Sequence, residues 1–315
     1  MKRYKPVSLR NVRTYPLGDR RSKVSTGSLA SPYEAGASFA DFASGLPGFL
    51  AAGDIRSVAS AVVRARDNGN PVILGMGAHP IKVGLSPVLL DLMERGLITA
   101  LAANGASIIH DFELSYAGHT SEDVASALRD GSFGMARETG SLINGAIRKG
   151  VKAGHGIGRS MGEFIENSKF PGKGLSLMAA AFRLGLPATV HVAMGTDIIH
   201  MHPSADGAAI GEGSLRDFRL LSSVVSDLEG GVYINLGSAV LMPEVFLKAL
   251  TVARNLGNKV SKFTTVSMDF KQHYRVSENV LRRPTSEGGA SYSLTGHHEI
   301  MLPLLAAMII EEATR

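Results

Sequence analysis

Two short clusters of acid–base side chains carry the chemistry that this sequence could perform. The first, His110-Asp-Phe-Glu113, combines an imidazole with two carboxylates. An imidazole transfers protons near neutral pH, and a carboxylate can orient it or bind a ribose hydroxyl or an ammonium group. His110 and Glu113 are therefore candidate catalytic residues. Asp111 has two interpretations, because an aspartate in such a position also caps helices.

The second cluster is Thr196-Asp-Ile-Ile-His-Met-His202. Its His-x-His pair could supply two metal ligands, but no third ligand is identifiable and the spacing alone is not specific for metal. We therefore expect no metal here. Asp197 and His200 are instead candidates for proton transfer or for binding an amine.

Apolar runs that end in glycine or small polar residues indicate the elements that position these clusters. Short runs of this kind are typical of buried parallel strands. Because ligands of an open parallel sheet bind beyond the carboxyl ends of its strands, the loops that follow the runs are expected to form the site. The predicted strands are 72–77, 97–103, 187–194, 231–236 and 263–267. The predicted helices are 38–43, 54–66 (with Asp54 as its cap), 87–95, 175–184, 243–255 and 299–313.

Composition supports an α/β fold with one core. The 315 residues are 44% hydrophobic and include 36 glycines but only 6% aromatic residues. A chain of this size can bury one large core, so we expect one Rossmann-type α/β domain, a parallel sheet flanked by helices, over residues 36–315. Cysteine is absent, which excludes disulfides, thiolate zinc sites, iron–sulfur clusters and a cysteine nucleophile.

Positive charge is concentrated at the N-terminus. Residues 1–25 contain eight basic side chains and one acidic one, whereas the whole chain has a net charge of +5, so the remainder is slightly acidic. We interpret residues 1–35 as a basic arm, either a solvated tail or a functional extension, and not as a nucleic-acid-binding face. No apolar stretch approaches the roughly 20 residues that span a bilayer, and we expect a cytoplasmic protein.

Two further motifs leave alternatives open. The glycine-rich segment Gly154–Gly162 could place backbone donors around a phosphate at a helix start, but it lacks the P-loop lysine, and a flexible connector is the other interpretation. Arg282 and Arg283 could clamp a carboxylate or phosphate, or belong to a solvated loop.

Taken in order, the strand-end loops resemble the deoxyhypusine synthase family from about Pro71 to Ala313. The resemblance includes the turn Asn104–Asp111, the helix Ser176-Leu-Met-Ala-Ala-Ala-Phe-Arg-Leu-Gly-Leu-Pro187, the strand and turn Val232–Ser238, and Pro303-Leu-Leu305. It implies an NAD-binding sheet and a homotetramer with sites between subunits. The implied cofactor-binding residues are Gly75, Gly77, Asn104, Gly105, Asp111, Gly237, Ser238, Thr265 and Asp269.

One departure from that family bears on mechanism. The family uses a lysine in a Trp-Gly-Lys motif to form an imine, whereas this chain has no tryptophan and places Pro284 at the corresponding position. Imine chemistry by the family route is therefore not expected.

The segment Ala103–Glu113 is also similar to the Gly-Asn-Ala-x-x-x-His-Asp-Ile-Glu motif of ornithine-degrading LOR/SDH proteins. Both resemblances imply NAD oxidising an amine-bearing carbon of a polyamine or amino acid, leading to aminoalkyl transfer or deamination. The other hypothesis is a non-catalytic nucleotide-binding or assembly protein of the same fold.

Overall fold

The computed structural model describes residues 3–314. Six strands form one sheet in the order β3-β2-β1-β4-β5-β6, and every neighbouring pair is parallel. The strands are β1 Val72–Met76, β2 Ala100–Asn104, β3 Ala188–His191, β4 Val232–Leu236, β5 Thr264–Asp269 and β6 Ala290–Thr295. The predicted α/β class with a parallel sheet flanked by helices is confirmed.

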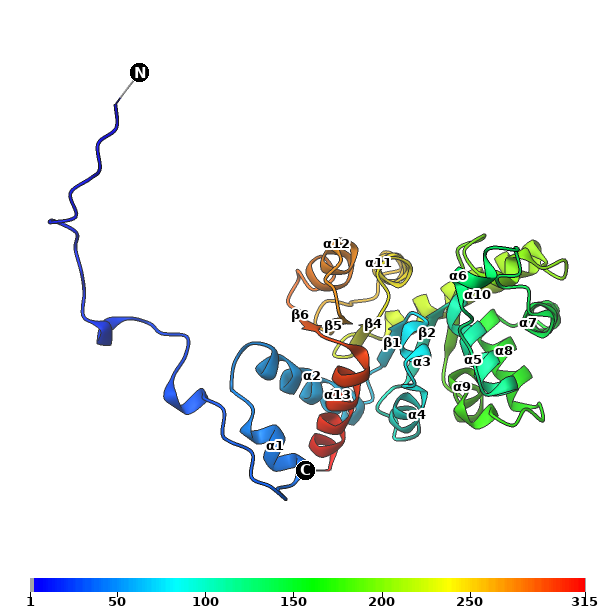
Figure 1. Ribbon diagram of the computed structural model, residues 1–315, viewed down its shortest axis with the longest axis horizontal. Helices are drawn as coiled ribbons and strands as arrows, with labels where there is room; N and C mark the ends of the chain where they lie inside the picture. The colour runs from blue at the N-terminus through cyan, green and yellow to red at the C-terminus, as the bar shows by residue number, and fades with distance from the viewer. Residues whose placement is uncertain (1–2, 315) are drawn as a thin grey trace.

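Helices cover both faces of the sheet. Figure 1 shows α11 and α12 on one side of the strands and α2, α4 and α13 on the other. The helices are α1 Phe39–Gly45, α2 Leu50–Asp67, α3 His79–Lys82, α4 Ser86–Glu94, α5 Gly105–Ala117, α6 Val124–Ala127, α7 Arg137–Lys152, α8 Ile157–Glu166, α9 Leu177–Leu184, α10 Gly207–Ser226, α11 Leu241–Asn255, α12 Tyr274–Val276 and α13 His298–Ala313.

Alternation along the strands divides the core between the two faces. In β1, Val72, Leu74 and Met76 join the larger cluster under α2, α4, α5 and α13, whereas Ile73 joins the cluster under α10 and α11. Successive side chains of a strand point to opposite faces, and here both faces are covered. This explains why the strands read as continuous apolar runs.

Three local expectations differ from the structure. The run before Thr295 forms a sixth strand, β6, which its exposed and partly exposed serines concealed. Helix α2 begins at Leu50 and not at Asp54. The segment Gly154–Gly162 is not a flexible connector, because α8 starts within it and buries Ile157 and Met161.

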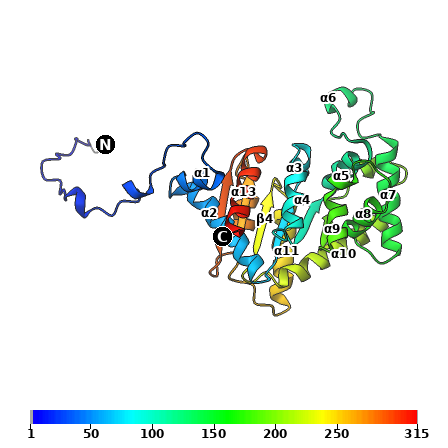
Figure 2. The same ribbon diagram turned by 90° about the horizontal axis from the view of Figure 1, so that it is seen from below.

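The N-terminal arm lies apart from the sheet. Figures 1 and 2 show it stretching away from the body before α1 begins. Its large apolar side chains, including Tyr4, Val7 and Leu9, are exposed, and it approaches the body where Gly48 N donates to Ser28 O at 2.9 Å. Among residues 3–314, no helix is long and apolar enough to span a membrane.

Candidate functional site

The carboxyl ends of β1 and β4 meet at the centre of the sheet, where the strand order reverses direction. Gly77 follows β1 and Gly237 follows β4, and a Cβ on Gly77 would lie 2.4 Å from the carbonyl oxygen of Gly237. Gly237 has a left-handed φ of 62°, and its amide donates to Met268 O at 3.0 Å. Such a switch point is the usual ligand crevice of a doubly wound sheet.

Other predicted residues extend this edge. Asp269, the last residue of β5, is buried and its Oδ1 accepts the amide of Phe270 at 2.8 Å. Ser238 Oγ accepts the amide of Met242 at 3.2 Å and so anchors the start of α11. His298 Nε2 lies 3.1 Å from Met268 O, which places a buried imidazole beside the same turn. The edge therefore combines side-chain-free turns with buried polar groups.

Two predicted cofactor residues lie away from this edge. Thr265 is the second residue of β5, roughly 13 Å along the strand from Asp269 at 3.3 Å per residue. Gly75 lies inside β1, where a Cβ would come 2.2 Å from the buried hydroxyl of Tyr233. Packing against Tyr233 is enough to explain Gly75. The rise per residue along β5 puts Thr265 at the end of the strand that is remote from the crevice.

Asn104 and Gly105 join β2 directly to α5. Asn104 Oδ1 accepts the amide of Ser107 at 3.0 Å and is the cap of the helix. A Cβ on Gly105 would lie 2.0 Å from Asp197 Oδ2, so the first turn of α5 packs against a carboxyl group from the second cluster. The structure thus brings Asp197 to a strand end that the sequence placed far from it.

Asp197 and His200 lie on either side of a short 3-10 turn, Ile198–Met201. Gly195 N and Asp197 N donate to His200 Nδ1 at 3.1 and 3.3 Å, so the proton of the neutral ring is on Nε2. Neither His200 Nε2 nor Asp197 Oδ2 has a hydrogen-bond partner in the described chain. Burial raises the pKa of Asp197 to about 6 and lowers the pKa of His200.

Asp111 has a structural task. Its carboxylate accepts Ser176 Oγ at 2.5 Å, Leu177 N at 2.8 Å and Met178 N at 3.4 Å, which caps the start of α9. Burial raises its pKa to about 6 against the lowering effect of these hydrogen bonds. This geometry favours the capping interpretation, and a role in nucleotide binding stays a prediction.

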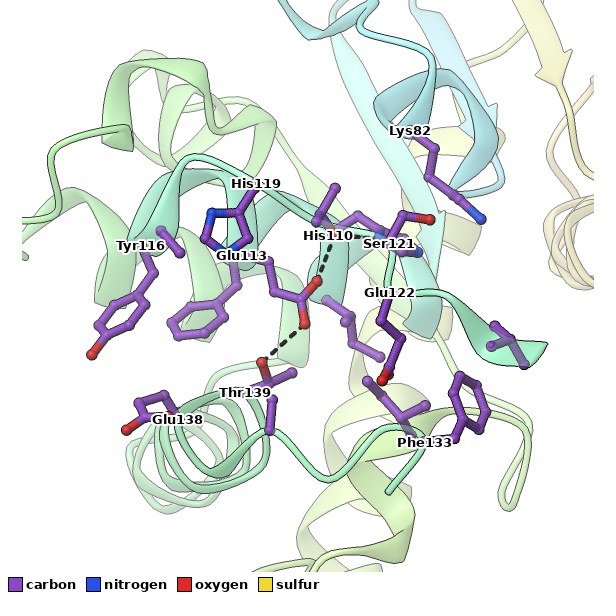
Figure 3. A pocket seen from close by; sticks show the side chains of 17 residues that line it. Lys82, His110, Glu113, Tyr116, His119, Ser121, Glu122, Phe133, Glu138 and Thr139 are labelled. Carbon is purple, nitrogen blue, oxygen red and sulfur yellow. Dashed lines mark hydrogen bonds between the residues drawn. The ribbon is translucent and has the colours of Figure 1, made fainter. Parts of the chain in front are cut away.

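His110 and Glu113 instead line a cavity of about 520 Å³ beside α5. Figure 3 shows Lys82, His110, Glu113, Glu122 and Thr139 around it. The walls combine polar groups with the apolar surfaces of Ile109, Phe112, Tyr116, Phe133 and Ile198. Helix α3 follows the carboxyl end of β1, and α5 follows the carboxyl end of β2. The cavity therefore lies at the same edge of the sheet as the crevice.

A chain of hydrogen bonds connects the two candidate catalytic residues. His110 Nδ1 lies 2.6 Å from Thr120 Oγ1, and that hydroxyl donates to Glu113 Oε2 at 2.5 Å. Thr139 Oγ1 donates to Glu113 Oε1 at 2.9 Å (Figure 3). Burial lowers the pKa of His110, with the charge of Glu113 acting in the opposite direction. Such an imidazole is suited to accept a proton from a bound ligand near neutral pH.

Charge around the cavity is mainly negative. Glu113, Glu122 and Glu138 line it, together with the single cation Lys82 from the end of α3. An apolar cavity lined with carboxylates is suited to a ligand that carries an ammonium group on a carbon stem. The arrangement can therefore hold an amine and accept a proton from it.

Sequence reasoning missed several residues of the cavity: Lys82, Thr120, Glu122, Glu138 and Thr139. Lys82 falls in the loop region that follows the first predicted strand, and this position was the available signal. Thr120 and Glu122 belong to residues 118–136, a polar stretch without periodicity. Only in the folded chain does this segment lie against α5.

Two other motifs are satisfied internally. The amide of Gly158, at the start of α8, donates to Asp217 Oδ2 at 2.9 Å, so a buried carboxylate occupies the place proposed for a phosphate. Arg282 and Arg283 pair with Glu278 on the same turn, which leaves no observation in favour of a ligand clamp. Among the described residues, no group of three His, Cys, Asp or Glu side chains could hold a metal ion.

The strand order and the crevice define a doubly wound, Rossmann-like α/β fold. No protein-family model and no curated protein matches the sequence. Solved structures with the same fold include a LOR/SDH candidate protein from Methanococcus maripaludis S2, with 18% identity, a TM-score of 0.54, and coverage of 82% of this chain and 67% of that one.

A deoxyhypusine synthase candidate from Entamoeba histolytica is similar over 90% of this chain and 96% of its own, with 11% identity and a TM-score of 0.52. The complex of AgrE with ornithine and NAD+ is similar over 82% of this chain, with 18% identity and a TM-score of 0.50. This chain spans 33% of the length of AgrE. At these identities the likeness establishes the fold.

Proposed function

We propose that the protein is an NAD-dependent enzyme that oxidises an amine-bearing carbon of a small substrate, a polyamine or an amino acid. The observation that carries the proposal is the placement of the His110–Thr120–Glu113 chain in a cavity on the carboxyl side of a Rossmann-ordered sheet. Support comes also from the AgrE structure, which contains ornithine and NAD+.

The main chain around the central crevice leaves room for a dinucleotide. Gly77 and Gly237 meet without side chains, which allows a ligand to approach main-chain atoms. Gly77, Gly237, Ser238 and Asp269 would hold the cofactor, with the carboxylate suited to a ribose hydroxyl. When bound, NAD would accept a hydride from the substrate carbon.

The remaining steps belong to the chain itself. Glu122 and Glu138 attract the ammonium group into the cavity, and the aromatic wall of Phe112 and Tyr116 packs against the carbon stem of the substrate. His110 accepts the proton that the amine must lose before its carbon can be oxidised. No lysine occupies the segment 281–287, so the imine formed after oxidation would remain on the substrate nitrogen.

NAD binding provides the first test. Titration of the protein with NAD, followed calorimetrically, should saturate, and Asp269→Ala should weaken the affinity about tenfold or more through loss of a charged hydrogen bond. Asp227→Ala is the control, because Asp227 lies after α10 at the other end of the sheet. Absence of binding by the unaltered protein would refute the proposal.

Turnover separates this proposal from a non-catalytic nucleotide-binding or assembly protein. That alternative is favoured by the absence of the family lysine, since Pro284 stands in its place. Protein with NAD and a panel of polyamines and diamino acids should release or transiently form NADH, and His110→Asn should abolish this while retaining NAD affinity. NAD binding without turnover of any amine would favour the alternative.

A further inference from the structure

The hydroxyl of Thr120 lies between the imidazole of His110 and the carboxylate of Glu113. Its Oγ1 is 2.6 Å from His110 Nδ1 and 2.5 Å from Glu113 Oε2. The other oxygen of Glu113 accepts the hydroxyl of Thr139 at 2.9 Å, which holds the carboxylate in place from a second helix, α7. Three side chains from α5 and the segment after it therefore form one connected group.

Proton counting assigns the direction of each bond. An ionised carboxylate only accepts, so the single proton of the Thr120 hydroxyl goes to Glu113. The hydroxyl oxygen then faces His110 Nδ1 with a lone pair, and Nδ1 must carry the proton of the neutral imidazole. His110 Nε2 is left with its lone pair free, and it has no hydrogen-bond partner among residues 3–314.

We propose that Thr120 is a positioning residue that holds neutral His110 in the Nδ1–H tautomer, so that Nε2 is the basic atom presented to the cavity. An imidazole without such a partner favours the Nε2–H form, in which the basic atom would face Thr120 instead. The tautomer assignment stands on the hydrogen bonds alone, and its consequence for catalysis rests on the proposed function.

Thr120 also makes the orientation of the base depend on a segment that protrudes from the body. It belongs to the protruding segment 118–136, which carries α6 and stands out from the body in Figure 2. Within the segment, Glu122 Oε1 accepts Gly134 N at 2.7 Å, and His202 Nε2 holds the segment against the body at 2.8 Å from Gly134 O. The same segment lines the cavity with Glu122 and Phe133. One segment therefore supplies both a wall of the cavity and the hydroxyl that contacts His110.

The charged groups that act on His110 come from two elements. Glu113 on α5 raises the pKa of the imidazole, and Lys82 at the end of α3 lowers it, while burial is the largest influence and also lowers it. Removal of the Thr120 hydroxyl leaves both charges in place. A change of tautomer can thus be distinguished from a change of net charge.

The test is the tautomer of His110 in ¹⁵N-histidine-labelled protein, observed by long-range ¹H–¹⁵N NMR at a pH where the ring is neutral, with His110→Asn to assign the signals. We expect Nδ1–H in the unaltered protein and predominantly Nε2–H in Thr120→Val and Thr120→Ala. Thr120→Ser should retain Nδ1–H. Thr139→Val is the matched control, because Thr139 contacts Glu113 but not His110, and it should also retain Nδ1–H.

An Nε2–H ring in the unaltered protein, or an Nδ1–H ring in a folded Thr120→Val or Thr120→Ala variant, would overturn the proposal. If the protein turns over an amine, Thr120→Val should lower kcat on the order of tenfold or more with little change in KM, and Thr120→Ser should restore it. Failure to bind NAD would refute the proposed function and leave the tautomer result standing.

Discussion

At the scale of single residues, buried carboxyl groups differ in how they are satisfied. Asp111 and Asp217 each accept backbone amides at a helix start. Asp197 packs against Gly105 and has one oxygen with no partner in the described chain. A buried, unpaired carboxylate is costly to ionise. Ionisation of Asp197 should therefore lower the free energy of unfolding.

Asp197→Asn should stabilise the protein in a pH-dependent way. The folded-state pKa of Asp197 is raised from 3.8 to about 6, so its favourable contribution is complete below 3.8 and is lost as the pH rises through 6. Near pH 7.5 the variant should gain up to about 3 kcal/mol in free energy of unfolding, and near pH 4 almost nothing. Urea denaturation across this range checks it, and parallel stability curves would contradict it.

Asp111→Ala should destabilise the fold irrespective of any ligand. The change leaves the hydroxyl of Ser176 and the amides of Leu177 and Met178 without their acceptor in the interior. The expected loss is about 2–4 kcal/mol in urea denaturation. Asp123→Ala removes the cap of the exposed α6 and should lose no more than about 1 kcal/mol. Equal losses would contradict the capping interpretation.

At the scale of elements, the glycine turns determine how the strands end. The first predicted glycine, Gly75, is required inside the sheet by Tyr233, whereas Gly77 is required at the edge by the backbone of Gly237. Sequence marks both in the same way, since each is a small residue near the end of an apolar run. Contacts between strands that are distant in sequence decide which glycine faces the crevice.

Gly77→Ala tests this close approach. The new methyl group would meet a backbone oxygen 2.4 Å away, so the ends of β1 and β4 must separate, at a cost of about 1–3 kcal/mol. Gly145→Ala is the matched control: it lies in α7 with open space around it and should stabilise the protein by about 0.5–1 kcal/mol. Thermal unfolding of the two variants should therefore shift in opposite directions.

At the scale of the whole molecule, the basic arm and the body are joined by few contacts. The hydrogen bonds of residues 3–25 reach no further than Ser28. The arm contacts the body through hydrogen bonds of Ser28 with Gly48 and of Ser31 with Gly45. The arm nevertheless exposes Tyr4, Tyr15 and Leu17. Its charge and apolar side chains are therefore available to a partner, and the homotetramer implied by the family resemblance would provide one.

Deletion of residues 1–27 should leave the body folded. Because such surface changes are usually within about 0.5 kcal/mol, the melting temperature should move by no more than about 2 °C. Light scattering of the full chain tests the tetramer directly, and a tetrameric mass that falls on deletion would assign the arm to the subunit interface. A large drop in melting temperature at unchanged mass would contradict the separation of arm and body.

The sequence by itself determined the α/β class and five of the six strands, because apolar runs and helix periodicity are local patterns. It also singled out His110 and Glu113, which line one cavity and whose catalytic role stays a prediction. It did not reveal β6, whose side chains are partly exposed, nor that Asp111 caps α9 while Thr120 serves His110. Those partners were decided by tertiary structure. A hydrogen bond depends on a fit of a few tenths of an ångström between segments that only packing brings together.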